Sequence, residues 1–124
     1  MIQIYICEDE KIQLEFWKRI IEDYIKSAKI MAEIVSARQN PQDILNDIEQ
    51  CDNSQRLFFI DIQMPEYDMN GLELARKLRE KNSDDYLVFI TSKDDLAYKV
   101  FEYQLDVLDY IMKKPKYYLE IGRA

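Results

Sequence analysis

The chain has 124 residues, of which 48% are hydrophobic and 33% are charged, with two glycines and a formal net charge of -7 at pH 7. This length suits one domain, and the composition is that of a globular, helix-rich protein. The acidic balance argues against a nucleic-acid-binding surface, which needs clustered lysine and arginine. The absence of histidine removes the commonest zinc ligand and the usual general base, so any metal should be a hard, oxygen-preferring ion such as Mg²⁺.

The sequence shows no export signal and no covalent cross-link. Cys7 and Cys51 are far apart in sequence, so neither a disulfide framework nor a CxxC metal site is predicted. The N-terminus lacks the basic start and apolar core of a signal peptide, and no run approaches the ~20 apolar residues of a membrane span. We therefore expect a cytoplasmic domain with reduced thiols and no membrane contact.

Strands and helices alternate along the chain. Runs of β-forming apolar residues predict the strands, and apolar residues at helical spacing predict the helices. In chain order, the predictions are a strand at 2–7, a helix ending near Ser27, a strand at 31–37, a helix that starts at Asn40 and Pro41, a strand from Leu57 to Asp61, a helix carrying Leu72, Ala75 and Leu78, a strand at 87–90, a helix capped by Asp94 or Asp95, and a strand at 107–112.

This alternation predicts an α/β domain with a parallel, doubly wound sheet and helices on both faces. Residues 116–121 are few for a last helix, because globular helices average about 10 to 14 residues, so that helix is expected to be short or truncated. No internal repeat or interdomain linker is visible, and residues 1–124 are interpreted as one domain. In such sheets the site lies beyond the carboxyl ends of the strands, where the strand order reverses.

Polar residues follow most of the predicted strands: Glu8 and Asp9 the first, Asp61 the third, Thr91 the fourth and Lys113 the fifth. Three carboxylates a few ångströms apart repel one another, and a divalent cation relieves this repulsion. The pattern indicates an Mg²⁺ site at which Asp61 attacks a phosphoryl group in line, with Lys113 and Thr91 stabilising the transferring group. The alternative is that Asp61 only caps the following turn.

At these positions the sequence resembles the receiver domain of two-component response regulators. The resemblance covers nearly the whole chain and rests on the order and spacing of four motifs. It implies a flavodoxin-like fold with a five-stranded parallel sheet in the order 2-1-3-4-5. The four motifs are Ile6-Cys7-Glu8-Asp9, Phe59-Ile60-Asp61-Ile62-Gln63-Met64-Pro65, Phe89-Ile90-Thr91-Ser92 and Asp109-Tyr110-Ile111-Met112-Lys113.

The resemblance also implies a role for each matching residue. A sensor histidine kinase would transfer a phosphoryl group to Asp61, and the domain would change conformation to control an output. No enzyme activity is implied beyond self-phosphorylation from a phosphodonor and slow autodephosphorylation. The other implied residues are Asp9 as a direct and Glu8 as a largely water-mediated Mg²⁺ ligand, the Gln63 backbone carbonyl as a further ligand, and Thr91, Lys113 and Tyr110 as the groups that stabilise the phosphoryl group or switch with it.

Three features depart from the pattern of the family. The first acid is Glu8, where Asp is commoner. The loop from Pro65 to Gly71 is longer than usual, and its acids Asp68 and Glu66 are expected to be solvated rather than to lean over the site. Most receivers have a lysine followed directly by proline with a cis bond, but two lysines precede the proline here. The spacing from Tyr110 favours Lys113 as the active lysine, and the lysine-proline pair favours Lys114.

The acidic pair, the inserted lysine and residues 91–93 are similar to the receivers of LytTR-type regulators, which respond to quorum-sensing peptides through a membrane histidine kinase. This resemblance implies transcription regulation through a DNA-binding output domain that these 124 residues do not include. A homodimer through the face of the fourth helix and fifth strand is also implied. Tyr98 and Tyr103 either belong to that face or are ordinary surface aromatics.

Two other functions stay open. A phosphatase of the haloacid dehalogenase type also uses an aspartate at a strand end and Mg²⁺, but it needs a second aspartate where this chain has Gln63. A receiver-like module that binds its partner without phosphorylation would not need the site residues, and their presence argues against it.

Overall fold

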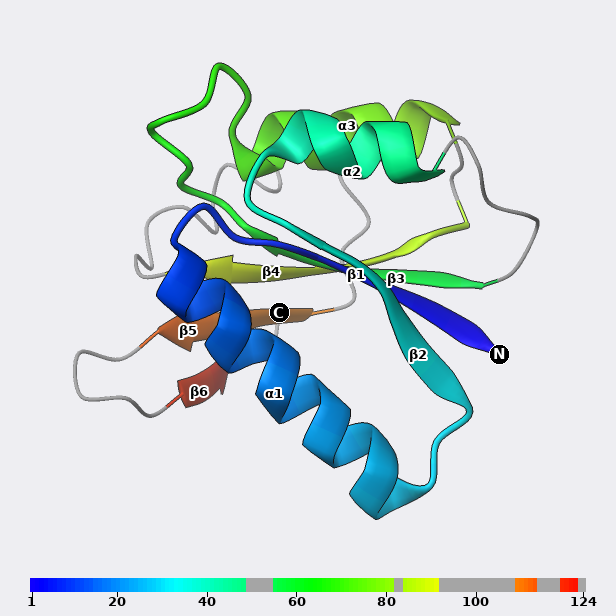
Figure 1. Cartoon of the computed structure of the whole chain (residues 1–124). Helices are drawn as coiled ribbons and strands as arrows, with labels where there is room; N and C mark the ends of the chain where they lie inside the picture. Colours follow the sequence, from blue (N-terminus) through cyan, green and yellow to red (C-terminus); the bar gives the residue numbers. More distant parts are fainter. Residues whose placement is uncertain (49–54, 82–83, 92–108, 114–118, 123–124) are drawn as a thin grey trace.

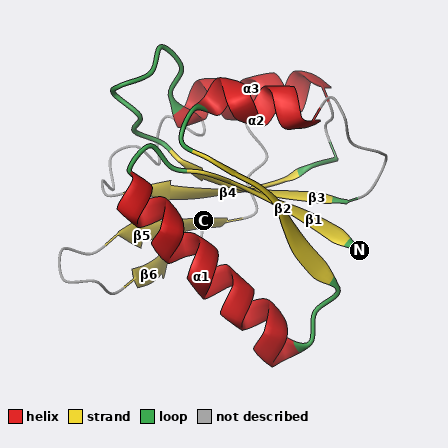
Figure 2. Ribbon diagram, viewed as in Figure 1, coloured by secondary structure: helices red, strands yellow, loops and turns green. Residues whose placement is uncertain are grey.

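The computed structural model describes residues 1–48, 55–81, 84–91, 109–113 and 119–122. In these residues a sheet lies between two layers of helices, with α1 on one face and α2 and α3 on the other (Figures 1 and 2). The elements are β1 (Ile2–Cys7), α1 (Lys11–Ala28), β2 (Ala32–Arg38), α2 (Pro41–Ile48), β3 (Arg56–Asp61), α3 (Gly71–Lys81), β4 (Tyr86–Thr91), β5 (Asp109–Lys113) and β6 (Leu119–Gly122).

Among the described residues, the sheet has six strands in the order β2-β1-β3-β4-β5-β6. The pairs from β2 to β5 are parallel, and the β5–β6 pair is antiparallel. The predicted α/β fold and its parallel order 2-1-3-4-5 are therefore confirmed. The chain winds outward from β1 to β2 on one side and to β3 on the other, so the strand order reverses beside β1.

The end of the described chain differs from the prediction. A short last helix was expected at 116–121, but Leu119–Gly122 form β6, which pairs with β5 between Tyr110 and Lys113. So few residues cannot repay the cost of nucleating a helix, whereas a strand gains hydrogen bonds from the open edge of β5. The helix predicted after Asp94 or Asp95 lies outside the described residues, as do Tyr98 and Tyr103.

Side chains of the inner strands are buried on both sheet faces. In β1, Tyr5 and Cys7 belong to the core under α2 and α3, whereas Ile4 and Ile6 belong to the core under α1. This division follows from the alternation of side chains along a strand. It explains why β3 and β4 are nearly continuous apolar runs, as strands covered on both faces must be.

The helices on the α2 and α3 face start at asparagine caps. The Asn40 side-chain oxygen accepts a hydrogen bond from the Gln42 N–H at 2.9 Å, which confirms the predicted cap of α2. The Asn70 side-chain oxygen accepts one from the Glu73 N–H, also at 2.9 Å. Within the described part of the chain, no helix combines the length and apolar character that crossing a membrane requires.

Candidate functional site

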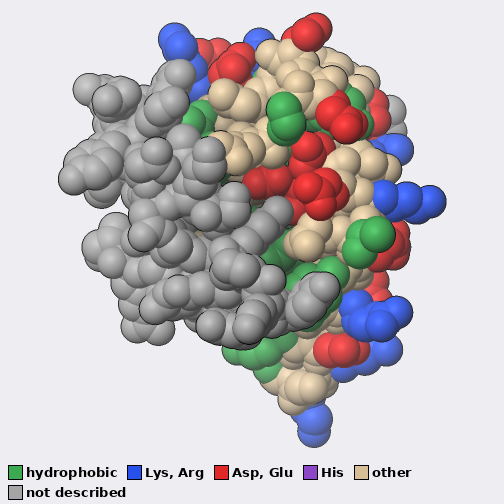
Figure 3. Space-filling view, turned by 90° about the vertical axis from the view of Figure 1, so that its left-hand side faces the viewer, with side chains coloured by type: hydrophobic (Ala, Val, Ile, Leu, Met, Phe, Trp, Pro, Cys, Tyr) green, Lys and Arg blue, Asp and Glu red, His purple; other side chains and the backbone are tan. Residues whose placement is uncertain are grey.

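Three carboxylates meet at the carboxyl edge of the sheet. One oxygen from each of Glu8, Asp9 and Asp61 lies within 4.8 Å of the other two. The register of the strands brings them together, because Cys7 at the end of β1 pairs with Ile60 of β3 and the acids follow directly. Figure 3 looks onto this end of the molecule, where acidic side chains gather near the centre of the view. The predicted convergence of the two strand ends is confirmed.

The acids differ in their exposure to solvent. Glu8 is fully buried, Asp61 is 5% exposed and Asp9 is half-buried. Burial, followed by the hydrogen bond and negative charge of Glu8, raises the pKa of Asp9. Burial and then the charge of Asp61 likewise raise the pKa of the Cys7 thiol, so Cys7 is a protonated, buried core residue.

The donor atoms of this cluster suit a hard divalent cation. All three ligand groups are carboxylates, which Mg²⁺ prefers. Burial is the main cause of the raised pKa of Asp9, and the negative charge of Glu8 adds to it; a bound cation would oppose both effects. Asp9 is also open enough to solvent for an ion that keeps several waters. Glu8, Asp9 and Asp61 are therefore the residues that could hold Mg²⁺.

The backbone around the acids is tied to neighbouring elements. The Glu8 N–H donates to the Arg38 carbonyl at 3.1 Å. The Gln39 side-chain amide donates to the Asp9 carbonyl at 2.9 Å, and the Glu10 N–H donates to a Glu8 carboxylate oxygen at 3.3 Å. The end of β2 thus holds the segment that carries the first two acids. The Gln39 contact was not predicted from sequence, because it depends on which loop lies beside β1.

The loop after Asp61 returns against the backbone of Asp61 itself. The Gly71 N–H donates to the Ile62 carbonyl at 2.9 Å, and the Ile62 N–H donates to the Ile90 carbonyl of β4 at 3.2 Å. A Cβ atom on Gly71 would lie 2.1 Å from the Asp61 carbonyl oxygen. Only glycine can lie this close to the Asp61 carbonyl. Its position fixes where the loop ends and α3 begins.

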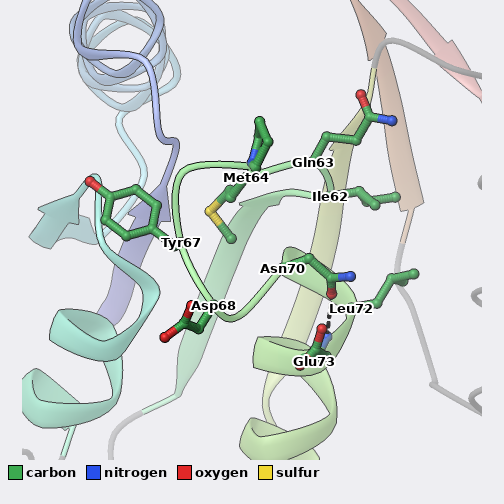
Figure 4. A pocket seen from close by; sticks show the side chains of 9 residues that line it. Ile62, Gln63, Met64, Tyr67, Asp68, Asn70, Leu72 and Glu73 are labelled. Atoms are coloured by element: carbon green, nitrogen blue, oxygen red, sulfur yellow. Dashed lines mark hydrogen bonds between the residues drawn. The ribbon is translucent and has the colours of Figure 1, made fainter.

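A cavity of about 440 Å³ lies under this loop and beside the first turn of α3. In Figure 4 the Gln63 side chain points away from that of Met64, while Tyr67 and Asp68 lie at the far end of the loop. Asp68 and Glu66 are exposed and do not belong to the acidic cluster. The expectation that these two acids are solvated is therefore confirmed.

Three predicted site residues lie in described strands, but their side chains are outside the described part of the structure. Thr91 ends β4, where its backbone pairs with Met112 of β5. Tyr110 and Lys113 belong to β5 and pair with β6. Lys114 lies outside the described residues, so the choice between Lys113 and Lys114 stays a prediction.

The sequence matches a known protein family over most of its length. Residues 4–117 match the response regulator receiver domain. The chain belongs to this family. It is 33% identical to accessory gene regulator protein A of Staphylococcus epidermidis and 34% identical to that of Staphylococcus aureus, in each case over 112 residues, 90% of this chain and 46% of the relative. These identities confirm the predicted likeness to the receiver domains of LytTR-type quorum-sensing regulators. The chain spans about half the length of these curated relatives.

Solved structures of this receiver family share the fold. The response regulatory domain of protein mrkE from Klebsiella pneumoniae has a TM-score of 0.72 and 24% identity, covering 92% of this chain and 84% of that one. Response regulator protein TrrA from Thermotoga maritima, in complex with Mg²⁺-BeF, has a TM-score of 0.71 and 24% identity, covering 94% and 90%. These likenesses support the parallel α/β architecture of the receiver.

Proposed function

We propose that this receiver accepts a phosphoryl group on Asp61 in the presence of Mg²⁺. The observation that carries the proposal is the cluster of Glu8, Asp9 and Asp61, whose oxygens lie within 4.8 Å of one another at the carboxyl edge. Carboxylates this close repel one another, and a divalent cation removes that repulsion. A cation at Asp61 would leave one carboxylate oxygen for chemistry.

Asp9 and Asp61 would bind Mg²⁺ directly, Glu8 largely through water, and the Gln63 backbone carbonyl would complete the protein ligands. When bound, Mg²⁺ neutralises the clustered carboxylates and the oxygens of the incoming phosphoryl group. The half-buried position of Asp9 leaves space for the water ligands that this ion retains.

The chemical step is an in-line transfer. A carboxylate oxygen of Asp61 attacks phosphorus, the bond from phosphorus to the donor histidine nitrogen breaks, and the electron pair leaves with that nitrogen, which takes up a proton from water. Lys113 and Thr91 stabilise the oxygens of the phosphoryl group. Thr91 moves toward the new phosphoryl group, and Tyr110 turns inward behind it. Slow hydrolysis of the aspartyl phosphate resets the domain without conventional turnover.

A sensor histidine kinase is the proposed phosphodonor, in the cytoplasm. The accessory gene regulator relatives support a quorum-sensing role and an output in transcription regulation. Contact with DNA would occur only through an output domain, because this chain is acidic. A homodimer through the fourth-helix and fifth-strand face would connect phosphorylation to that output.

A beryllium fluoride titration tests the phosphoacceptor role, because this ion mimics a phosphoryl group on a carboxylate. Thermal unfolding is measured with Mg²⁺ alone, beryllium fluoride alone and both together. In the presence of Mg²⁺, beryllium fluoride at a hundredfold excess over its Kd should stabilise the chain by about 2.7 kcal/mol beyond the effect of Mg²⁺ alone, and thus raise the Tm by roughly a further 10 °C. Asp61→Asn should lose the combined effect, and Asp68→Asn, whose side chain is exposed, should keep it. A full shift in Asp61→Asn would overturn the proposal.

A further inference from the structure

One of the two acids that would bind Mg²⁺ directly, Asp9, lies in a short connection between a strand and a helix. Asp9 lies between the end of β1 at Cys7 and the start of α1 at Lys11. Glu10, at the N-cap of α1, makes no side-chain capping hydrogen bond. The backbone of Glu10 is held by the Leu14 N–H, which donates to its carbonyl at 2.9 Å, and by its own N–H, which donates to Glu8 at 3.3 Å. The carbonyl of Asp9 itself is held by a contact from outside this connection.

Contacts from outside this connection come from the end of β2. The Gln39 side-chain amide donates to the Asp9 carbonyl at 2.9 Å, and the Arg38 carbonyl accepts from the Glu8 N–H at 3.1 Å. The bond to Asp9 comes from the Gln39 side chain, whereas the bond to Glu8 joins two backbone groups. A substitution at Gln39 can therefore remove the hydrogen bond to Asp9 and leave the hydrogen bond to Glu8 intact.

The end of β2 is itself anchored to α2. The Arg38 guanidinium donates to both carboxylate oxygens of Asp47, at 2.9 and 3.2 Å, and the Ser36 hydroxyl donates to the same carboxylate at 2.5 Å. The Asn40 side chain caps α2 directly after Gln39. Gln39 thus projects from a backbone that is fixed on both sides.

We propose that Gln39 is a positioning residue for the divalent-cation site, acting by holding the Asp9 backbone at the distance from Asp61 that a shared Mg²⁺ requires. The inference rests on the proposed function, because it takes Asp9 and Asp61 as ligands of one ion. Mg²⁺ demands nearly ideal octahedral geometry, so its affinity falls when a ligand can move away. Removing partners that orient metal ligands costs about 10- to 100-fold in affinity, and a contact to the ligand's backbone belongs at the lower end.

Calorimetric titration of the 124-residue chain with Mg²⁺ alone tests this role. Gln39→Met keeps the length of the side chain and removes the donor, and its Kd should be about tenfold weaker than that of the unaltered chain. Gln42→Met is the matched control, because the Gln42 amide donates to Asn46 on the exposed side of α2, away from Asp9. The control should bind Mg²⁺ within twofold of the unaltered chain.

Two further measurements separate positioning from a general structural role. The rate of labelling by acetyl phosphate in Gln39→Met should return to the unaltered rate at saturating Mg²⁺, because the reacting residues remain. Gln39→Asn, which shortens the side chain by one methylene, should repeat the loss of affinity if the first variant folds poorly. If Gln39→Met and Gln39→Asn both bind Mg²⁺ as tightly as the unaltered chain, the inference is overturned. If the unaltered chain does not bind Mg²⁺, the proposed metal site is overturned as well.

Discussion

Replacing Gly71 by alanine places two energetic effects of opposite sign at one position. Alanine is the better helix former, and in the first turn of α3 it would add about 0.4 to 1 kcal/mol of stability. Its Cβ, however, would lie 2.1 Å from the Asp61 carbonyl oxygen and 2.8 Å from the Ile62 Cα, both backbone atoms. Overpacking costs about 1 to 3 kcal/mol even where side chains can move, and here the backbone must shift.

The clash should therefore win. Because the backbone must shift, the clash should cost about 3 kcal/mol, and the gain in helix propensity leaves a net loss of about 2 kcal/mol of unfolding free energy, which lowers the Tm by roughly 8 °C. Urea unfolding followed by Trp17 fluorescence measures the stability, and acetyl phosphate labelling reports the displacement of Asp61. Lys77→Ala, on the exposed side of α3, is the control for helix propensity and should change stability by less than about 0.5 kcal/mol. A higher Tm in Gly71→Ala with unchanged labelling would refute the close approach.

Three further substitutions test the ion pairs and the acidic cluster. Arg56→Met strips the buried Asp85 carboxylate of its bidentate partner, at 3.0 and 3.1 Å, and should cost about 3 to 5 kcal/mol in urea unfolding; a loss below about 1 kcal/mol would contradict the buried pair. The hydrogen bonds from Arg38 and Ser36 hold the pKa of Asp47 below its usual range, so their stabilisation is present above about pH 4 and lost as the pH falls through that lowered pKa. Between pH 5 and pH 2 the Tm should therefore fall less steeply with falling pH in Asp47→Asn than in the unaltered chain. Equal slopes of Tm against pH would rule out a contribution of Asp47 to acid unfolding. Asp9→Asn removes a charge that burial and Glu8 disfavour, so its folded-state pKa is raised and without Mg²⁺ the variant should melt at a higher temperature at pH 7, while its Mg²⁺ affinity falls at least about tenfold; a lower Tm would contradict the raised pKa.

The sheet could be predicted because its signals are local. The apolar runs of β3 and β4 identify strands covered on both faces, and residues at helical spacing identify α1 and α3. The strand ends then place Glu8, Asp9 and Asp61 at one edge without any knowledge of side-chain contacts, since parallel strands share their direction. The same reasoning failed at β6, where a short segment takes its structure from a neighbouring strand edge rather than from its own sequence.

Contacts between distant segments could not be predicted. Asp85 follows a polar helix end and carries no sequence signal, yet it pairs with Arg56 because β3 and β4 are neighbours in register from Leu57 and Tyr86. The contact of Gln39 with Asp9 depends in the same way on the placement of β2 beside β1. Such pairs depend on which strands are neighbours in the sheet. A single sequence predicts that strand order only through its resemblance to a family of known fold.

Intact mass spectrometry shows whether Asp61 carries the phosphoryl group. The unaltered chain, Asp61→Ala and Asp68→Ala are each incubated with acetyl phosphate and Mg²⁺. A gain of about 80 Da, one phosphoryl group, is expected in the unaltered chain and in Asp68→Ala but not in Asp61→Ala. The same gain in Asp61→Ala would show that another residue accepts the phosphoryl group, and no gain in any of the three proteins would rule out transfer from acetyl phosphate to Asp61.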